Sequence, residues 1–148
     1  MIPAINIINF ISTGSNLAGV ELNDPLENAL ALLGPPTEKI GTDKYGFMLF
    51  EGGLRYGYFN DVVDELSILF YPEARYSYFV ENNLNEQLSI DGKTQLHQFI
   101  YLLKTAAVKW RCIDDKNTLS LTIEMNSATF AYFDLHTGYL DKIFIARK

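Results

Sequence analysis

Two stretches of this sequence, 74 residues apart, resemble each other: Tyr56–Phe70 reads YGYFNDVVDELSILF and Phe130–Phe144 reads FAYFDLHTGYLDKIF. Superposed without gaps, they agree at four bulky positions, which pair Tyr58 with Tyr132, Phe59 with Phe133, Leu66 with Leu140 and Phe70 with Phe144. Apolar runs on both sides of polar turn residues are typical of a β-hairpin. The sequence therefore predicts a hairpin that occurs twice, with the rings of Phe59 and Phe133 in the core.

The start of the chain predicts a short helix and then a short strand. Pro3 suits the first turn of a helix, Gly14 suits its end, and the isoleucines between them recur at helical spacing. Their β-branched side chains leave a strand as the alternative for residues 3–13. Leu17–Leu22 is a short apolar segment that fits a strand.

A second helix is predicted to begin at Asp24-Pro25-Leu26-Glu27. The Asp24 side chain can cap the helix, Pro25 lacks an N–H where none is needed, and Glu27 can reach back to the cap. One apolar stripe follows at helical spacing, made of Leu26, Ala29, Leu30 and Leu33. Gly34-Pro35-Pro36 ends the helix.

Short alternating runs then predict three antiparallel strands, at Tyr45–Glu51, Leu54–Phe59 and Val62–Phe70. Gly52-Gly53 and Asn60-Asp61 supply the turns between them. Alternation puts Leu54, Tyr56 and Tyr58 on one face of the middle strand, and Leu66, Ile68 and Phe70 on one face of the third.

The second half repeats this order. Leu88–Ile90 predicts a short strand, Asp91 can cap a helix as Asp24 does, and a stripe of Leu96, Phe99, Ile100 and Leu103 predicts that helix. Four strands are then expected, at Val108–Ile113, Leu119–Met125, Ala128–Leu135 and about Tyr139–Ile145. In Leu119–Met125 the apolar residues alternate with Ser120, Thr122 and Glu124, which predicts one buried and one polar face.

These elements predict an α+β fold in one domain, residues 1–148, with two similar halves at 15–71 and 86–147. Each half would consist of a short strand, an amphipathic helix and an antiparallel meander, with the sheets joined edge to edge and the helices packed on the sheet. Because Ile68 falls on Lys142 in the superposition, the two halves cannot bury this position alike. A short α+β domain without duplication is the alternative.

The chain has a formal charge of −6, and residues 1–74 account for −7 of it against +1 for residues 75–148. An acidic surface repels phosphate backbones and anionic lipids, so neither nucleic acid nor a membrane is expected as a partner. It would attract a basic protein. The alternative is that the charge only keeps the protein soluble.

The N-terminal MIPAINIINFISTG lacks the basic region of a signal peptide, and no segment is apolar over the roughly 18 residues of a membrane span. We therefore expect a cytoplasmic protein. The single Cys112 excludes an internal disulfide, and its apolar neighbours predict a buried thiol.

Motifs for catalysis or metal binding are incomplete. Asp91-Gly92-Lys93-Thr94 contains the end of a phosphate-binding loop, but that loop needs glycine where the chain has Gln87. His97 and His136 are 39 residues apart with no cysteine near either, which is not metal-site spacing. We therefore expect no catalytic residues, no cofactor and no metal, and hence a protein that is not an enzyme.

An acidic and aromatic region in the first half predicts a surface for a protein partner. Tyrosine gives contact area at low entropic cost, and acidic side chains at the rim steer a cationic partner. The candidate contact residues are Tyr56, Tyr58, Asp61, Asp64, Glu65, Tyr71, Glu73, Tyr76 and Tyr78. In the ungapped superposition Asp61, Asp64 and Glu65 fall on Leu135, Gly138 and Tyr139, so only the first copy is acidic. The alternatives are solvated turn carboxylates and half-buried strand tyrosines.

The order from Gly14-Ser15 through the helix ending Leu32-Leu33-Gly34-Pro35-Pro36 to Leu66-Ser67-Ile68 resembles immunity proteins of bacterial polymorphic-toxin and contact-dependent growth inhibition systems. The resemblance covers residues 10–70. It implies a cytoplasmic, non-catalytic protein that binds one cognate toxin domain tightly, and many such toxins are nucleases with basic surfaces. Two alternatives remain: a small-ligand-binding protein or enzyme with an aromatic-lined pocket, and a housekeeping adaptor. The oligomeric state stays open.

Overall fold

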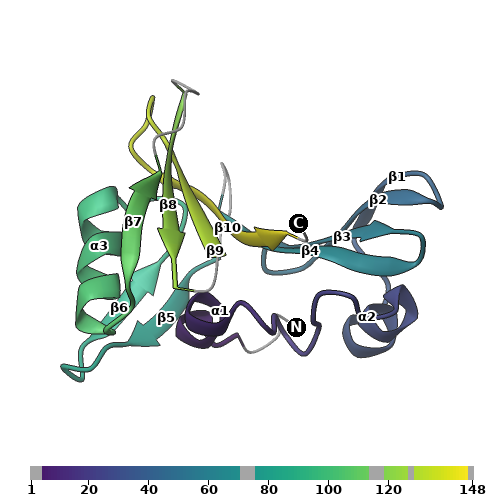
Figure 1. Cartoon of the computed structure of the whole chain (residues 1–148), viewed down its shortest axis with the longest axis horizontal. Coiled ribbons are helices and arrows are strands. Elements are labelled where there is room, and N and C mark those ends of the chain that lie inside the picture. Colours follow the sequence, from purple (N-terminus) through teal and green to yellow (C-terminus); the bar gives the residue numbers. More distant parts are fainter. Residues whose placement is uncertain (1–4, 71–75, 114–118, 127–128, 147–148) are drawn as a thin grey trace.

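The computed structural model describes residues 5–70, 76–113, 119–126 and 129–146. Its elements are α1 (Ile7–Thr13), α2 (Leu26–Leu33), β1 (Glu38–Gly41), β2 (Tyr45–Phe50), β3 (Leu54–Phe59), β4 (Val62–Leu69), β5 (Tyr78–Glu81), β6 (Gln87–Ile90), α3 (Leu96–Thr105), β7 (Trp110–Ile113), β8 (Ser120–Met125), β9 (Thr129–Asp134) and β10 (Leu140–Ala146). The expected α+β class is confirmed, since helices accompany a mostly antiparallel sheet (Figure 1).

Eight strands form one sheet in the order β1-β2-β3-β4-β10-β9-β8-β7. Each run of four is a meander, and β4 pairs with β10 in the middle through Ile68 and Ile143. In Figure 1, β7 and β8 run nearly vertically whereas β3 and β4 run nearly horizontally, so the sheet is strongly twisted. A separate pair, β5-β6, makes a second small sheet.

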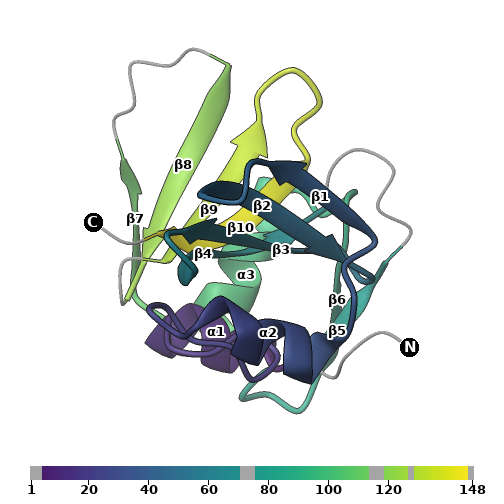
Figure 2. The ribbon, with the colours of Figure 1, turned by 90° about the vertical axis from the view of Figure 1, so that its right-hand side faces the viewer.

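The helices and the β5-β6 hairpin lie on one side of this sheet, as Figures 1 and 2 show. The core forms between them: Phe10 and Ile11 of α1 are fully buried, and Phe99 of α3 packs edge-on against Phe133 of β9 at 5.5 Å between ring centroids. Two tyrosine hydroxyls tie strands to loops, because Tyr56 donates to Leu17 O at 2.8 Å and Tyr78 donates to Gly52 O.

The first two helices agree with the sequence in place but not in every detail. Gly14 ends α1 in the left-handed conformation, with φ of 60°. In α2, however, the cap residue is Pro25 and no side chain caps the helix, so the predicted Asp24–Glu27 capping box is wrong. The Asp24 carboxylate accepts from the N–H of Glu21 at 2.9 Å instead, which stabilises the turn before the helix.

The predicted strand at Leu17–Leu22 is wrong. Leu17 and Val20 form an isolated bridge around Ala18 and Gly19, both at positive φ, so this segment is a tight turn. Both bridge residues are fully buried, and their apolar character therefore reflects burial in the core.

The third helix begins later than Asp91 suggests. Gln95 is the cap residue, its N–H donates to the Gln98 side chain at 2.8 Å, and the two residues form a capping box. Asp91 accepts from the N–H of Lys93 at 2.8 Å in the preceding turn. An aspartate that could cap a helix can also accept from another nearby backbone N–H, and here Asp91 accepts from the turn.

The predicted strand at Leu88–Ile90 is confirmed as β6, whereas β1 and β5 lacked a clear sequence signal. The edge strand β1 is exposed along its length, so it has no apolar alternation. The β5-β6 hairpin owes its turn to the buried Asn82, whose side-chain carbonyl accepts from Leu84 and Glu86 N–H and whose amide donates to Thr105 of α3 at 3.1 Å.

The ungapped superposition of the two hairpins is wrong in register. Tyr58 and Val63 face each other in the first hairpin, as Phe133 and Leu140 do in the second. Tyr58 is therefore the counterpart of Phe133, and the second turn is longer. The apparent match of Phe59 with Phe133 joins opposite faces: Phe59 is 46% exposed and Phe133 is 1% exposed.

Two burial expectations are also corrected. Cys112 is exposed, because it lies on the edge strand β7. In β8, Ile123 and Met125 are buried as expected, but Leu119 precedes the strand and is 75% exposed, while the polar Thr122 is buried.

Candidate functional site

The side of the eight-stranded sheet opposite the helices is the candidate site. No described helix lies over this side (Figures 1 and 2), which we call the open face. Because side chains alternate along a strand, the registers place these residues on it: Phe47, Leu49, Arg55, Gly57, Glu65, Ser67, Leu69, Arg111, Ile113, Ser120, Thr122, Glu124, Phe130, Tyr132, Asp134, Lys142 and Phe144. The open face is thus rich in aromatic and charged side chains.

On the first half of the open face, Arg55 of β3 lies between a ring and a carboxylate. Its guanidinium carbon is 4.4 Å from the centroid of the Phe47 ring, and its Nη2 is 3.1 Å from Glu65 Oε2. Both charged side chains are mostly buried, with 20% and 14% of their surface exposed. The pair is therefore better shielded from water than a surface ion pair.

On the second half, Lys142 of β10 lies among three aromatic rings. Its Nζ is 4.4 Å from the centroid of Phe144 and 5.0 Å from that of Tyr132, and Phe130 stacks near Phe144 at 5.5 Å. Burial lowers the pKa of the Lys142 ammonium from its ordinary value, and the nearby Arg55 charge adds to this shift. Further out, Arg111 pairs with Glu124 at 2.7 Å.

Three buried polar atoms on the open face have no hydrogen-bond partner within the part of the chain that the structure describes. They are Arg55 Nε, Ser67 Oγ and Thr122 Oγ1. Ser67 is fully buried and Thr122 is 4% exposed. Buried polar groups are normally satisfied, so the open face has unused hydrogen-bonding capacity.

A hollow of about 490 Å³ lies at the second-half end of the open face, lined by Leu119, Ser120, Tyr132, Asp134, His136, Asp141 and Lys142. Asp141 is half-buried there, and its carboxylate makes no ion pair or hydrogen bond with another described residue. Burial raises the pKa of Asp141 above its ordinary value. The charge of Lys142 is the largest opposing effect, Asp134 raises the pKa further, and Arg55 lowers it. We call this the Asp141 hollow.

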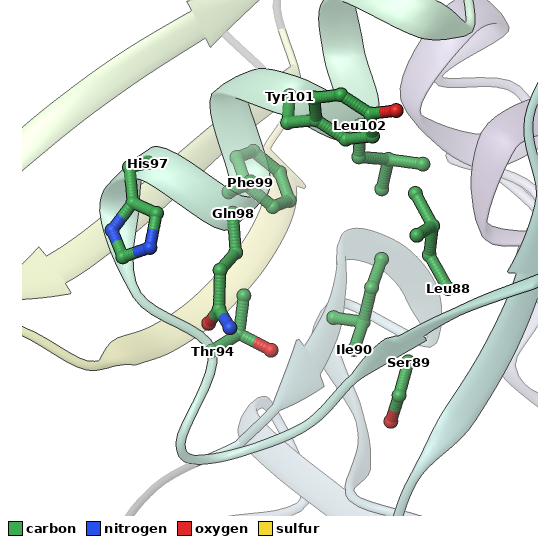
Figure 3. Close-up of a pocket in the computed structure, with 9 residues that line it drawn as sticks. All are labelled: Leu88, Ser89, Ile90, Thr94, His97, Gln98, Phe99, Tyr101 and Leu102. Carbon is green, nitrogen blue, oxygen red and sulfur yellow. The ribbon is translucent and has the colours of Figure 1, made fainter.

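A second cavity, of about 420 Å³, lies between α3 and β6 (Figure 3). Its wall is mainly apolar, and the side chains of Leu88 and Ile90 point from β6 toward the helix while Ser89 points away. Two of its polar side chains already have structural tasks. Gln98 accepts from the cap N–H of α3, and Thr94 accepts from Asp91 N–H at 2.9 Å.

Three of the predicted contact tyrosines lie in the core and are corrected. Tyr56 is 0%, Tyr58 1% and Tyr78 8% exposed, and each donates its hydroxyl to a backbone carbonyl. These rings cannot contact a partner on the surface. Tyr76 is half-buried beside the core, and Tyr71 and Glu73 fall outside the described residues.

The predicted acidic residues separate. Asp61 is exposed in the tight turn between β3 and β4, where Asn60 and Asp61 have φ of 50° and 61°. Asp64 and Glu65 reach the open face, since a Cβ on Gly57 would lie 2.6 Å from Asp64 Oδ1 and 2.9 Å from Glu65 Cβ. The structure therefore brings together two of the three acids.

Sequence reasoning missed the second-half residues of the open face. The ungapped superposition hid Asp141, which corresponds to Asp64 once the hairpins are aligned by their pairing. The expectation that only the first copy is acidic is therefore wrong at this position. The one available signal was the dipeptide Leu140-Asp141, which repeats Val63-Asp64.

The remaining motifs do not add a site. No three His, Cys, Asp or Glu side chains of the described residues come together as a metal-binding group. His97 and His136 line different cavities. Within the described ranges, no helix has the length and apolar character needed to cross a membrane.

The fold and the open face define an α+β protein in which the described helices all cover the same side of an eight-stranded antiparallel sheet. No protein-family model, curated protein or solved structure matches the chain.

Proposed function

We propose that this chain is a cytoplasmic, non-catalytic immunity protein, which neutralises a cognate bacterial toxin by binding it tightly through the open face. The observation that carries the proposal is the set of half-buried rings and charges on a sheet face over which no helix of the described residues lies. Exposed aromatic and arginine side chains are the residue types that dominate protein interfaces. The toxin class rests on the resemblance of residues 10–70 to immunity proteins.

Charge complementarity supports a basic partner. The protein carries −6, and Asp64, Glu65, Asp134 and Asp141 lie on or beside the open face. Opposite charge on the toxin would speed encounter and favour one orientation of docking. Nuclease toxins need basic surfaces for their substrates, so a nuclease domain fits this charge.

We also infer that the two halves are copies of one unit. In the turn before α2, Glu21 N–H donates to the Asp24 carboxylate at 2.9 Å, and before α3 the N–H of Asp91 donates to the Thr94 hydroxyl at 2.9 Å. In the first half the carbonyl of Asp24 accepts from Val63 N–H of the hairpin at 2.9 Å. In the second half the carbonyl of Thr94 accepts from Leu140 N–H at 2.8 Å. These bonds support the same chain path in both halves.

The proposal predicts a toxin-like reading frame directly upstream of the gene, and the test uses the product of that frame. The two chains are expected to form a stable complex by calorimetry, and co-expression should restore growth of cells that make the toxin. Phe144→Glu on the open face should weaken the complex, whereas Phe79→Glu should not, because Phe79 is an exposed ring on β5 (65% exposed), which belongs to the separate small sheet. Failure of the purified chains to bind, or of co-expression to protect, refutes the proposal.

The cavity between α3 and β6 supports a second candidate, a small-ligand-binding protein. A volume of about 420 Å³ with a mainly apolar wall is within the range of ligand pockets. Indole is a suitable probe, because it is flat, apolar and carries one donor. Saturable shifts of the Leu88, Phe99 and Leu102 signals in NMR spectra would favour this function, and no shift at millimolar indole would remove it.

A further inference from the structure

The Asp141 hollow has the chemistry of a receptor for a cationic side chain. Asp141 is a half-buried carboxylate without an ion pair among the described residues, and Asp134 lies close enough to raise its pKa. A carboxylate that is partly removed from water and has no cation within ion-pair distance gains from a cation that binds directly beside it.

The lining of the hollow offers several acceptors to a ligand. The carboxylates of Asp134 and Asp141 belong to it, and so does the hydroxyl of Ser120, which lies directly opposite Asp134 on β8. A guanidinium offers five N–H donors in a planar fork, whereas an ammonium is a compact charge with three donors. The available acceptors therefore favour arginine over lysine.

The protein's own Lys142 does not fill this role. Its Nζ lies over the Phe144 and Tyr132 rings and forms no ion pair with a described carboxylate. It does lower the pKa of Asp141 through space, so it is a competing positive charge at the edge of the hollow.

We propose that the Asp141 hollow receives an arginine side chain of the basic partner protein, which pairs with Asp141 and is enclosed by Tyr132, Ser120 and Asp134. This inference rests on the proposed function, since it names the partner chemistry for one end of the open face. It fits the acidic protein and the size of the hollow, about 490 Å³, which is more than one side chain needs and leaves room for the partner backbone.

The test is an NMR titration of the ¹⁵N-labelled full chain with the peptide acetyl-Gly-Arg-Gly-amide. We expect saturable amide shifts confined to Tyr132, Asp134, His136 and Asp141. The citrulline peptide has the same shape without the charge and should cause none, and the lysine peptide should bind more weakly. Asp141→Asn should weaken binding about tenfold through loss of the charged hydrogen bond. Lys142→Met should strengthen it, because it removes the competing charge.

The control variant is Asp43→Asn, which removes an acid whose side chain is fully exposed and lies at the other end of the sheet. It should leave the titration unchanged. Shifts spread over all acidic regions, equal binding of citrulline, or an unchanged affinity in Asp141→Asn would each overturn the inference. Toxin binding that survives Asp141→Asn but is lost in Phe144→Glu would overturn the arginine site alone. If both Asp141→Asn and Phe144→Glu still bind the toxin, the open face is not the interface.

Discussion

Asp64 and Asp141 are the extra residues of two matching β-bulges. In the first hairpin, Gly57 pairs with Glu65 and Tyr58 with Val63, so Asp64 is inserted between them. In the second, Tyr132 pairs with Lys142 and Phe133 with Leu140, so Asp141 is inserted there. A bulge re-aims side chains, and here each turns an aspartate toward the open face. The residues that follow differ in charge, Glu65 in one half and Lys142 in the other.

The opposite exposure of Phe59 and Phe133 predicts different costs for the same truncation. Phe133→Ala should reduce the free energy of unfolding by about 3–5 kcal/mol, because it leaves a cavity beside Phe99. Phe59→Ala should cost about 1 kcal/mol or less, since nearly half of that ring is already in water. Urea denaturation measures both. Equal losses would contradict the conclusion that Tyr58, and not Phe59, is the counterpart of Phe133 in the first hairpin.

Gly53 and Gly138 provide a matched pair, because both have φ of 78°. A Cβ at Gly53 would lie 2.3 Å from the carbonyl oxygen of Leu69, whereas a Cβ at Gly138 would meet nothing within 4 Å. Gly138→Ala should cost about 1–2 kcal/mol from the backbone conformation alone. Gly53→Ala should cost at least about 1 kcal/mol more, from the clash. Thermal unfolding compares them, and an equal shift would show that the turn at Gly53 relaxes.

Tyr78 makes stability depend on alkaline pH. Burial raises its pKa from 10.0 to about 12, with a smaller effect of Tyr76. Between these values the unfolded chain releases the phenol proton and the folded chain keeps it. The contribution of Tyr78 is therefore complete below pH 10 and falls by about 1.4 kcal/mol per pH unit until about pH 12.

The measurement is urea unfolding at several values of pH from 9 to 12. Tyr78→Phe should flatten the fall in stability, although Tyr56, whose pKa burial also raises, will preserve part of it. Tyr45→Phe is the control, since Tyr45 is 57% exposed and should leave the slope unchanged. A slope that is the same in Tyr78→Phe and in the parent would argue against a buried phenol at this position.

Cys112 is expected to react with a thiol reagent in the folded protein, because it is exposed on the edge strand β7. Ellman's reagent should modify it without denaturant, at a rate similar to that in urea. Cys112→Ser should show no reaction. Protection in the native state would mean that another chain covers the β7 edge.

Asp61 should affect the rate of partner binding more than the strength of the bound state. It is exposed at the β3–β4 turn, so Asp61→Lys is expected to slow association with a basic toxin and to do so less at high salt. Dissociation should change little. Stopped-flow mixing at two salt concentrations measures both rates, and an unchanged association rate would place the turn outside the path of encounter.

Local patterns predicted much of the fold. Strands β2, β3 and β4 were found because glycine or Asn60-Asp61 turns separate alternating runs, and the turn geometry follows from residues that tolerate positive φ. Edge strand β1 was missed because it buries nothing. The β5-β6 hairpin depends on Asn82, whose partners include Thr105, 23 residues away, and no local pattern encodes such a contact.

For the candidate site, the sequence indicated the acidic hairpin but not the surface. It identified Asp64 and Glu65, and it also selected Tyr56, Tyr58 and Tyr78, which are core residues. A tyrosine in an alternating strand is compatible with either face. Only the position of the helices decides which face is buried, and the hydroxyls of these tyrosines then find backbone carbonyls inside.

The sequence by itself determined the α+β class, the places of the helices and the main hairpins, because turn residues and apolar periodicity act over a few residues. The tertiary structure decided the register of the two hairpins, the burial of each tyrosine, the exposure of Cys112 and the meeting of β4 with β10. That central pairing brings Glu65 and Arg55 of one half onto the same face as Lys142 and Asp141 of the other. Contacts across such long separations depend on how the two halves pack, which short-range patterns do not specify.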